Sequence, residues 1–132
     1  MTAPNLELQA AIVAAVQADT ALMALIKGIY DRVPSDPWGS VQGYISFGPE
    51  DSITEADCVD FYDISIQLDV WSRQTGRVHC KQILHELRRV METVETTENP
   101  IVDMGDPSEQ IMRDPDGLTT HGVLQYTVLM EG

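Results

Sequence analysis

Apolar and polar residues alternate with a period of two between positions 62 and 70. The apolar members are Tyr62, Ile64, Ile66, Leu68 and Val70, and the residues between them are Asp63, Ser65, Gln67 and Asp69. Successive side chains of a strand point to opposite faces, so this pattern predicts a strand with one face in the core and one in water. Less regular patterns predict further strands at residues 29–33, 43–48, 101–113 and 118–130. The strand at 101–113 is interrupted near Gly105 and Pro107, which favour a bulge or an edge.

A helical period follows the segment WSRQTG, residues 71–76. Apolar residues then recur at steps of three and four: Ile83, Leu84, Leu87, Val90, Met91 and Val94. This spacing predicts an amphipathic helix over residues 77–94, with Ser72 or Thr75 as a cap at its start. Two shorter helices are predicted before it, one over residues 6–16 after Asn5 and one over residues 21–27 after Asp19 or Thr20. Gly28 is expected to end the second of these helices.

The order of these elements predicts an α+β fold. We expect an antiparallel sheet of about four to five strands, with the N-terminal helices and one long amphipathic helix packed on one face. A single domain is predicted over residues 1–132, with a helical arm at 1–28 and the sheet plus helix at 29–132. Residues 48–59 are acidic and aperiodic, and we interpret them as a mobile loop that becomes ordered on meeting a partner.

Composition indicates a soluble globular protein in a reducing cytoplasm. Hydrophobic residues make up 43% and charged residues 22%, and no apolar run is long enough to span a membrane. The apolar run at residues 8–18 has no basic residue before it, so it is predicted to be a retained helix and not a signal peptide. Cys58 and Cys80 lack the spacing of zinc ligands and are expected to be free thiols.

The charge is strongly negative and unevenly distributed. The formal net charge is -13, from 21 acidic and 8 basic residues, which argues against tight wrapping around nucleic acid. Five of the basic residues fall within residues 73–89, whereas residues 50–69 are acidic. The basic helix has two interpretations, a weak nucleic-acid element or a surface that packs against an acidic neighbour, and the second fits the charge asymmetry better. Such asymmetry also predicts that copies of the chain pair side by side.

The segment DPDG has the composition of a tight turn. Its residues are Asp114, Pro115, Asp116 and Gly117. Proline fixes φ, aspartate bonds nearby backbone N–H groups and glycine tolerates positive φ, so we predict a structural turn. A calcium loop is not indicated, because the further oxygen ligands and the late Glu are missing.

No constellation of residues indicates catalysis or metal binding. His121 has no nucleophile or orienting group that the sequence identifies, and a surface or half-buried histidine is the simpler interpretation. His79 and His85 are six positions apart and should diverge on a helix. Cys80 is expected to be buried, and Asp63 and Asp69 lie too far apart for a glycosidase pair. We therefore predict no enzyme activity, no cofactor and no metal.

The candidate functional residues are instead those of an interface with a partner or another subunit. Trp38 and Trp71 are either core or rim residues, or interface anchors, since a Trp in a Pro/Gly loop often serves as an anchor. The full set of interface candidates is Trp38, Glu50, Asp51, Glu55, Asp57, Trp71, Arg73, Arg77, Lys81, Arg88 and Arg89.

Three stretches together resemble a known family. They are IYDRVPSD with GYISFG (residues 29–36 and 43–48), IQLDVWSRQTGRVHCKQILHELRRVM (66–91) and IMRDPDGLTTHGVLQYTV (111–128). They resemble the small tail-completion or tail-terminator proteins of long-tailed DNA phages and gene-transfer particles, formerly a domain of unknown function. The likeness covers about residues 29–129, and its most specific parts are the strand-to-helix junction VWSRQTGR and the hairpin RDPDGLTTHGVLQY. One departure is Gly43 before Tyr44, where the family often has Pro.

The resemblance implies a structural protein of the virion or phage-like particle, located at the head-tail junction. During assembly it is expected in the host cytoplasm. The resemblance also implies an α+β subunit that forms a closed ring, commonly a hexamer, which ends tail-tube growth and joins the tail to the neck. The implied partners are sister copies, the tail tube protein and the neck or head-tail connector protein, while DNA passes through the lumen without specific binding. The family has no known catalytic site. Alternatives are a head-tail adaptor or stopper of the neck and, from other classes, a nucleic-acid-binding module or a small acidic protein-binding module or enzyme with no recognisable site.

Overall fold

A long pair of antiparallel strands forms the centre of the structure. The computed structural model describes residues 2–54 and 60–132. Strands β4 (Phe61–Ser72) and β7 (Thr120–Glu131) have 12 residues each and pair along their whole length, from Phe61 opposite Glu131 to Ser72 opposite Thr120. The alternation that predicted a strand at residues 62–70 is therefore confirmed.

The free side of β4 is divided between two strands. β2 (Gly43–Phe47) pairs antiparallel with the second half of β4, and β3 (Asp51–Thr54) pairs antiparallel with its first half. β1 (Ile29–Tyr30) extends the sheet beyond β2 and runs parallel to it. The sheet is therefore mixed: β1–β2 is a parallel pair, and the other pairs are antiparallel as expected.

The free side of β7 is divided in the same way. β6 (Ser108–Arg113) pairs antiparallel with the first half of β7, and β5 (Ile101–Asp103) pairs with its last residues. The predicted interruption near Gly105 thus separates two strands of one sheet edge. Among residues 2–54 and 60–132 the sheet has seven strands, which exceeds the four to five expected, while the predicted α+β class is confirmed.

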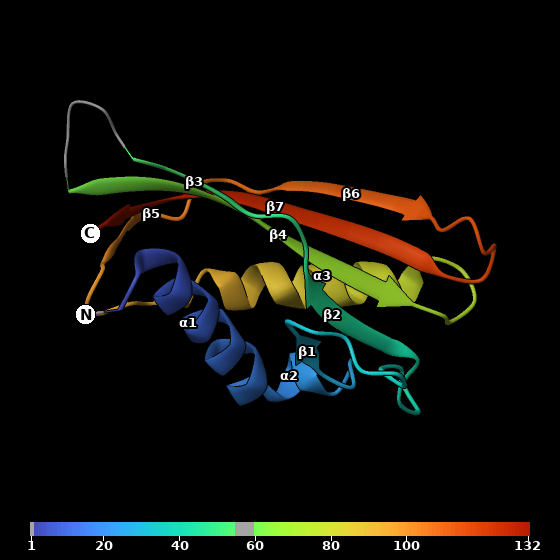
Figure 1. The fold of residues 1–132 in the computed structure, drawn as a ribbon. Coiled ribbons are helices and arrows are strands. Elements are labelled where there is room, and N and C mark those ends of the chain that lie inside the picture. The colour runs from blue at the N-terminus through green and yellow to red at the C-terminus, as the bar shows by residue number, and fades with distance from the viewer. Residues whose placement is uncertain (1, 55–59) are drawn as a thin grey trace.

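The helices of the described part of the chain lie on one side of the sheet (Figure 1). They are α1 (Pro4–Ala18), α2 (Thr20–Met23) and α3 (Val78–Met91). The even-numbered side chains of β4 and β7 point toward the helices, and the odd-numbered ones form what we call the outer face. The core joins Ile64, Ile66, Leu68 and Val70 of β4 and Leu124, Tyr126, Val128 and Met130 of β7 to Leu8, Ile12 and Val16 of α1 and Ile83, Leu84, Leu87, Val90 and Met91 of α3.

Two glycines let α3 approach the sheet closely. A Cβ atom on Gly43 of β2 would lie 2.6 Å from Cε1 of His79, and one on Gly122 of β7 would lie 2.9 Å from Sγ of Cys80. Any larger residue at these positions would push α3 away. The chain therefore has Gly in two buried strands, where glycine is otherwise unfavourable, because the helix backbone comes near.

The helix ends differ in part from the predicted ones. The Asp19 carboxylate accepts a hydrogen bond from the Leu22 N–H at 2.9 Å, which confirms Asp19 as the cap of α2. Asn5 is not the cap of α1, because Ala3 holds that position and Pro4 begins the helix. Proline suits the first turn, where its missing N–H leaves no bond unmade.

The start of α3 has no side-chain cap. Arg77 is its N-cap residue, so the expectation of Ser72 or Thr75 was wrong. The Ser72 hydroxyl instead bonds Nδ1 of His79 at 2.7 Å and accepts from the Gln74 N–H at 3.2 Å. α2 ends at Met23, before Gly28.

Two segments were assigned to the wrong structure. Residues 48–59 were expected to form a mobile loop, but residues 51–54 form β3; residues 55–59 lie outside the described part. All four residues of β3 are exposed, so an edge strand of this kind shows no apolar alternation. Leu118 was placed in the last strand, but it precedes β7 and is 72% exposed. Among the described residues, no helix is long and apolar enough to cross a membrane.

Candidate assembly surfaces

An aromatic cluster lies on the outer face, where β2, β4 and β7 meet. The rings of Trp71 and His121 stack with centroids 3.8 Å apart and planes 8° apart. Tyr44 stacks on the other side of Trp71 at 6.2 Å, and Trp38 meets Tyr44 edge to face at 4.9 Å. The guanidinium of Arg73 lies 4.1 Å from the centre of the Trp38 ring. Strand register produces the cluster, since Tyr44 is opposite Trp71 and Trp71 is opposite His121.

The polar groups around the cluster are paired with one another. The Asp69 carboxylate is 2.8 Å from Nε2 of His121 and accepts a hydrogen bond from Nε2 of Gln67 at 2.9 Å. The indole N–H of Trp71 donates to the Ser46 hydroxyl at 3.0 Å. Ser46 lies opposite Asp69 in the strand register. The Ser46 hydroxyl is therefore close to the Asp69–His121 pair, but it accepts the hydrogen bond from Trp71. The arrangement fixes the rings and is suited to a rigid contact surface.

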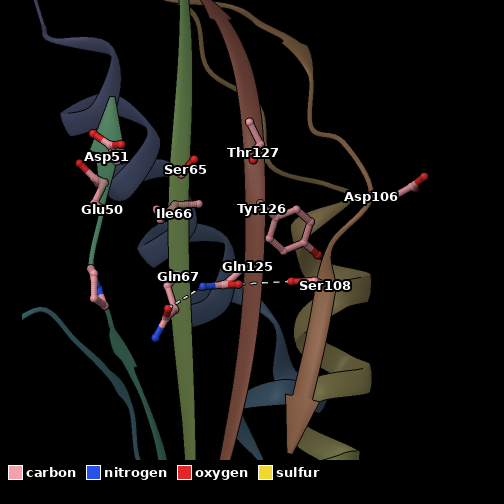
Figure 2. Close-up of a pocket in the computed structure, with 11 residues that line it drawn as sticks. Glu50, Asp51, Ser65, Ile66, Gln67, Asp106, Ser108, Gln125, Tyr126 and Thr127 are labelled. Atoms are coloured by element: carbon pink, nitrogen blue, oxygen red, sulfur yellow. Dashed lines mark hydrogen bonds between the residues drawn. The ribbon is translucent and has the colours of Figure 1, made fainter. Parts of the chain in front are cut away.

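A shallow hollow of about 400 Å³ continues along the outer face (Figure 2). Its floor is polar: Nε2 of Gln125 donates to Oε1 of Gln67 at 2.8 Å, and the Ser108 hydroxyl donates to Gln125 at 3.4 Å. Glu50 and Asp51 lie at its border on the β3 side. No group of three or more His, Cys, Asp or Glu residues that could hold a metal occurs in the described ranges. Every buried side-chain nitrogen and oxygen in the described residues has a hydrogen-bond partner.

The basic residues proposed as interface candidates are divided between two places. Arg73 belongs to the aromatic cluster, and Nε of Arg73 also donates to the Thr119 hydroxyl at 3.4 Å. Arg77 begins α3. Lys81, Arg88 and Arg89 line a hollow of about 520 Å³ on the exposed side of α3. They do not form one continuous stripe with Arg73.

Two of these arginines are partly neutralised within the chain. Nη2 of Arg89 is 2.7 Å from Oδ1 of Asp19, and its Nε is 2.7 Å from Oε2 of Glu86. Nη1 of Arg88 is 3.8 Å from Oε1 of Glu109 on β6. The hydrogen bonds from Leu22 and Arg89 hold the pKa of Asp19 below its usual value. Arg89 therefore connects α3 to the start of α2, whereas the longer, exposed Arg88–Glu109 pair only shows that α3 lies beside the β6 edge.

The described acidic candidates, Glu50 and Asp51, lie at the edge of the sheet that β3 forms. Asp51 begins β3, and Glu50 precedes it and accepts a hydrogen bond from the Asn5 amide at 3.2 Å. Both are exposed. Glu55 and Asp57 lie outside the described residues.

The DPDG segment forms a turn between β6 and β7. The Gly117 N–H donates to the Asp114 carbonyl at 3.0 Å, and Gly117 has a φ of +73°. The Asp116 carboxylate accepts from the Leu118 and Thr119 N–H groups, both at 2.8 Å, and from the Thr119 hydroxyl at 2.6 Å. These bonds lower the pKa of Asp116. These three hydrogen bonds to Asp116 explain the conformation of the turn without a bound calcium ion.

The remaining titratable residues of α3 are placed by packing. His79 is buried, and its Nε2 lies 2.8 Å from the Leu25 carbonyl oxygen, while His85 is exposed. Cys80 is fully buried, and this burial raises the pKa of its thiol to about 11. The thiolate is therefore absent at neutral pH.

Sequence reasoning missed Tyr44, Gln125 and Ser108 as parts of the outer surface. The alternation of β4 had correctly placed Gln67 and Asp69 on the water-facing side. Their partners on β2, β6 and β7 depend on strand register, which the sequence did not reveal.

Comparisons with known proteins agree with this geometry. The sequence matches the family described as tail completion protein gp17 over residues 10–131. The fold is similar to a chain in a solved structure described as the virion of a native gene transfer agent (GTA) particle, with a TM-score of 0.82, 22% sequence identity and 100% of each chain covered. No curated protein sequence matches the chain.

Proposed function

The chain belongs to the tail completion protein gp17 family, and from this premise we propose that its copies form a closed ring at the head-proximal end of a phage-like tail tube. The family match confirms the resemblance indicated by the sequence. The protein is a structural component of a phage-type tail and is located in the virion. In the proposed ring, which we expect to be a hexamer, it stops tube growth and joins the tail to the neck. We expect it to bind the tube protein and the neck connector and to catalyse no reaction.

The composition of the outer face is the observation that carries the proposed passage of DNA. Its side chains on β2, β3, β4, β6 and β7 are Tyr44, Ser46, Asp51, Ile53, Phe61, Asp63, Ser65, Gln67, Asp69, Trp71, Ser108, Gln110, Met112, His121, Val123, Gln125, Thr127, Leu129 and Glu131. None of these strand positions, all within the described ranges, carries Lys or Arg. Arg73 follows β4 and adds a positive charge at the aromatic cluster of this face, where it lies over the Trp38 ring. The strand positions themselves form an acidic and neutral wall, which repels phosphates and favours movement of DNA over adhesion. The three helices leave this face uncovered (Figure 1).

The two edges of the sheet, at β3 and at β6, have unlike surfaces, which also suits a ring. One side ends in the exposed, acidic β3, and the other ends in β6, which the Arg88–Glu109 pair connects to the basic residues of α3. A ring requires contacts between two unlike surfaces of the same subunit, repeated until they close. A single self-complementary surface would instead give a two-fold dimer.

Electron microscopy of particles made without this protein tests the proposed role. Overlong tail tubes are expected, because nothing would stop tube polymerisation. Tails of normal length that are detached from heads would contradict the terminator role and indicate a head-tail adaptor or stopper.

A charge substitution tests the proposed lumen. Gln125→Lys would add a positive charge to the outer face of each copy, and Gln125→Glu is the matched control of opposite sign. Particles of both variants should assemble equally, and DNA transfer should fall only in the Gln125→Lys particles. Equal transfer by both would contradict a channel wall at this face.

A further inference from the structure

In the described part of the chain, each side of the sheet ends in two edge strands, β1 and β3 on one side and β5 and β6 on the other; β6 and β3 are the longer edge strand of each side. Within the part of the chain that the structure describes, no strand pairs with the outer side of either one. The Asp114 N–H donates to the Thr119 carbonyl at 2.9 Å, so this pair is hydrogen-bonded, and alternation along the ladder turns the backbone groups of Glu109, Ile111 and Arg113 away from β7. An open row of such groups is a template for another strand.

The same reasoning identifies the open groups of β3. The Gly48 N–H donates to the Gln67 carbonyl and the Arg73 N–H donates to the Gln42 carbonyl, both at 2.9 Å. The odd-numbered residues of β4 therefore bond toward β2 and β3. Because Asp51 is opposite Ser65, the backbone groups of Ser52 and Thr54 point away from β4.

We propose that β6 of one copy pairs antiparallel with β3 of the next copy, so that one sheet continues around the ring. This inference rests on the ring proposed above and names its subunit contact. β3 runs antiparallel to β4, β4 to β7, and β7 to β6, so β6 and β3 run in opposite directions. A sheet that continues into the next copy in the same orientation therefore pairs them antiparallel.

Side-chain direction and charge select one register. Arg113 lies on the helix side of β6, and Glu50 lies on the helix side next to β3, where it bonds Asn5 of α1. Among the residues that the structure describes, Arg113 forms no ion pair. Placing Arg113 opposite Glu50 of the next copy brings these charges together and also matches the open backbone groups of both strands.

The exposed apolar residues of the two edges fit this register. It places Gln110 opposite Ile53 and Met112 opposite Asp51, all on the outer face. Ile53 is 60% exposed and Met112 is 38% exposed in the single chain. They become diagonal neighbours across the contact, within reach of each other's side chains. The pairing thus covers an apolar residue from each edge.

A proline substitution at an open N–H tests the pairing. Glu109→Pro removes a hydrogen-bond donor that points away from β7, and Glu109→Ala is the matched control, since both lose the contact with Arg88. We expect Glu109→Ala to retain tail completion and Glu109→Pro to lower the yield of complete particles by about tenfold or more, with both monomers equally folded by circular dichroism. Equal particle yields from the two folded variants would overturn the pairing.

A crosslink in assembled particles gives an independent readout. In a Cys58→Ser background, Gln110→Cys and Ile53→Cys on one chain should oxidise to a ladder of covalent multimers. Either cysteine alone should give none beyond a dimer. Particles that contain several copies but yield no ladder would overturn the pairing and leave the ring intact. Particles with a single copy per tail would overturn the ring itself.

Discussion

Replacing Gly43 with alanine is a direct test of how α3 is seated on the sheet. The added Cβ would lie 2.6 Å from Cε1 of His79 and 3.3 Å from Cδ1 of Ile83. The His79 ring cannot move away freely, because Ser72 and the Leu25 carbonyl hold its two nitrogens at 2.7 and 2.8 Å. Overpacking of this kind costs about 1–3 kcal/mol, and releasing one ring hydrogen bond adds about 1 kcal/mol. We therefore expect Gly43→Ala to lower the free energy of unfolding by about 2–4 kcal/mol.

Thermal and urea unfolding of the purified chain measure this effect. A chain of 132 residues has an unfolding entropy of about 0.28 kcal/mol/K, so Tm should fall by roughly 7–14 °C. The control is the same substitution in a His79→Ala background, where the ring is gone and the cost should fall to about 1 kcal/mol. A cost below about 0.5 kcal/mol, or an equal cost in both backgrounds, would refute the close approach of α3 to β2.

Three further substitutions or treatments have expected outcomes. Asp19→Asn should lower the urea midpoint at pH 7, and this difference should shrink as the pH falls below 3.8, because the lowered pKa of Asp19 gives stability that is present above its usual value and is lost as pH falls through the folded-state pKa; a difference that does not change with pH would contradict this. In a Cys58→Ser background, Cys80 should resist iodoacetamide at pH 8 until urea unfolds the chain, and rapid labelling of the folded protein would show that the thiol is accessible. Leu124→Ala should destabilise the chain by about 2–5 kcal/mol, whereas Leu118→Ala, at an exposed site, should change stability by less than about 0.5 kcal/mol.

The elements that the sequence predicted well are those with a buried face. β4 alternates apolar and polar residues because one face contacts the helices, and α3 has an apolar stripe because it covers the sheet. Asp19 was identified as a cap because its role involves a backbone N–H only three residues away. Local pattern and local chemistry were sufficient in each case.

The elements that were missed depend on contacts between distant residues. β3 is exposed at all four positions, so no apolar period marks it, and it forms only because β4 offers bonds to its backbone. Arg89 pairs with Asp19 across 70 positions, and Trp71 meets His121 across 50. The division of the basic residues into two places follows from such pairings. Strand register decides the Trp71–His121 contact, and helix packing decides the Arg89–Asp19 pair. Neither the register nor the packing can be read from one sequence.

The net charge of -13 constrains how copies of this chain associate. Like-charged subunits repel, and at physiological ionic strength this repulsion is screened beyond about 8 Å, so the contact itself must supply the attraction. Backbone hydrogen bonds between β6 and β3 are directional and need no side-chain charge, and Arg113 opposite Glu50 adds a local attraction at one end. A subunit built this way can keep an acidic outer face toward DNA and still bind its neighbour, because the residues that repel phosphates are not the groups that join the copies.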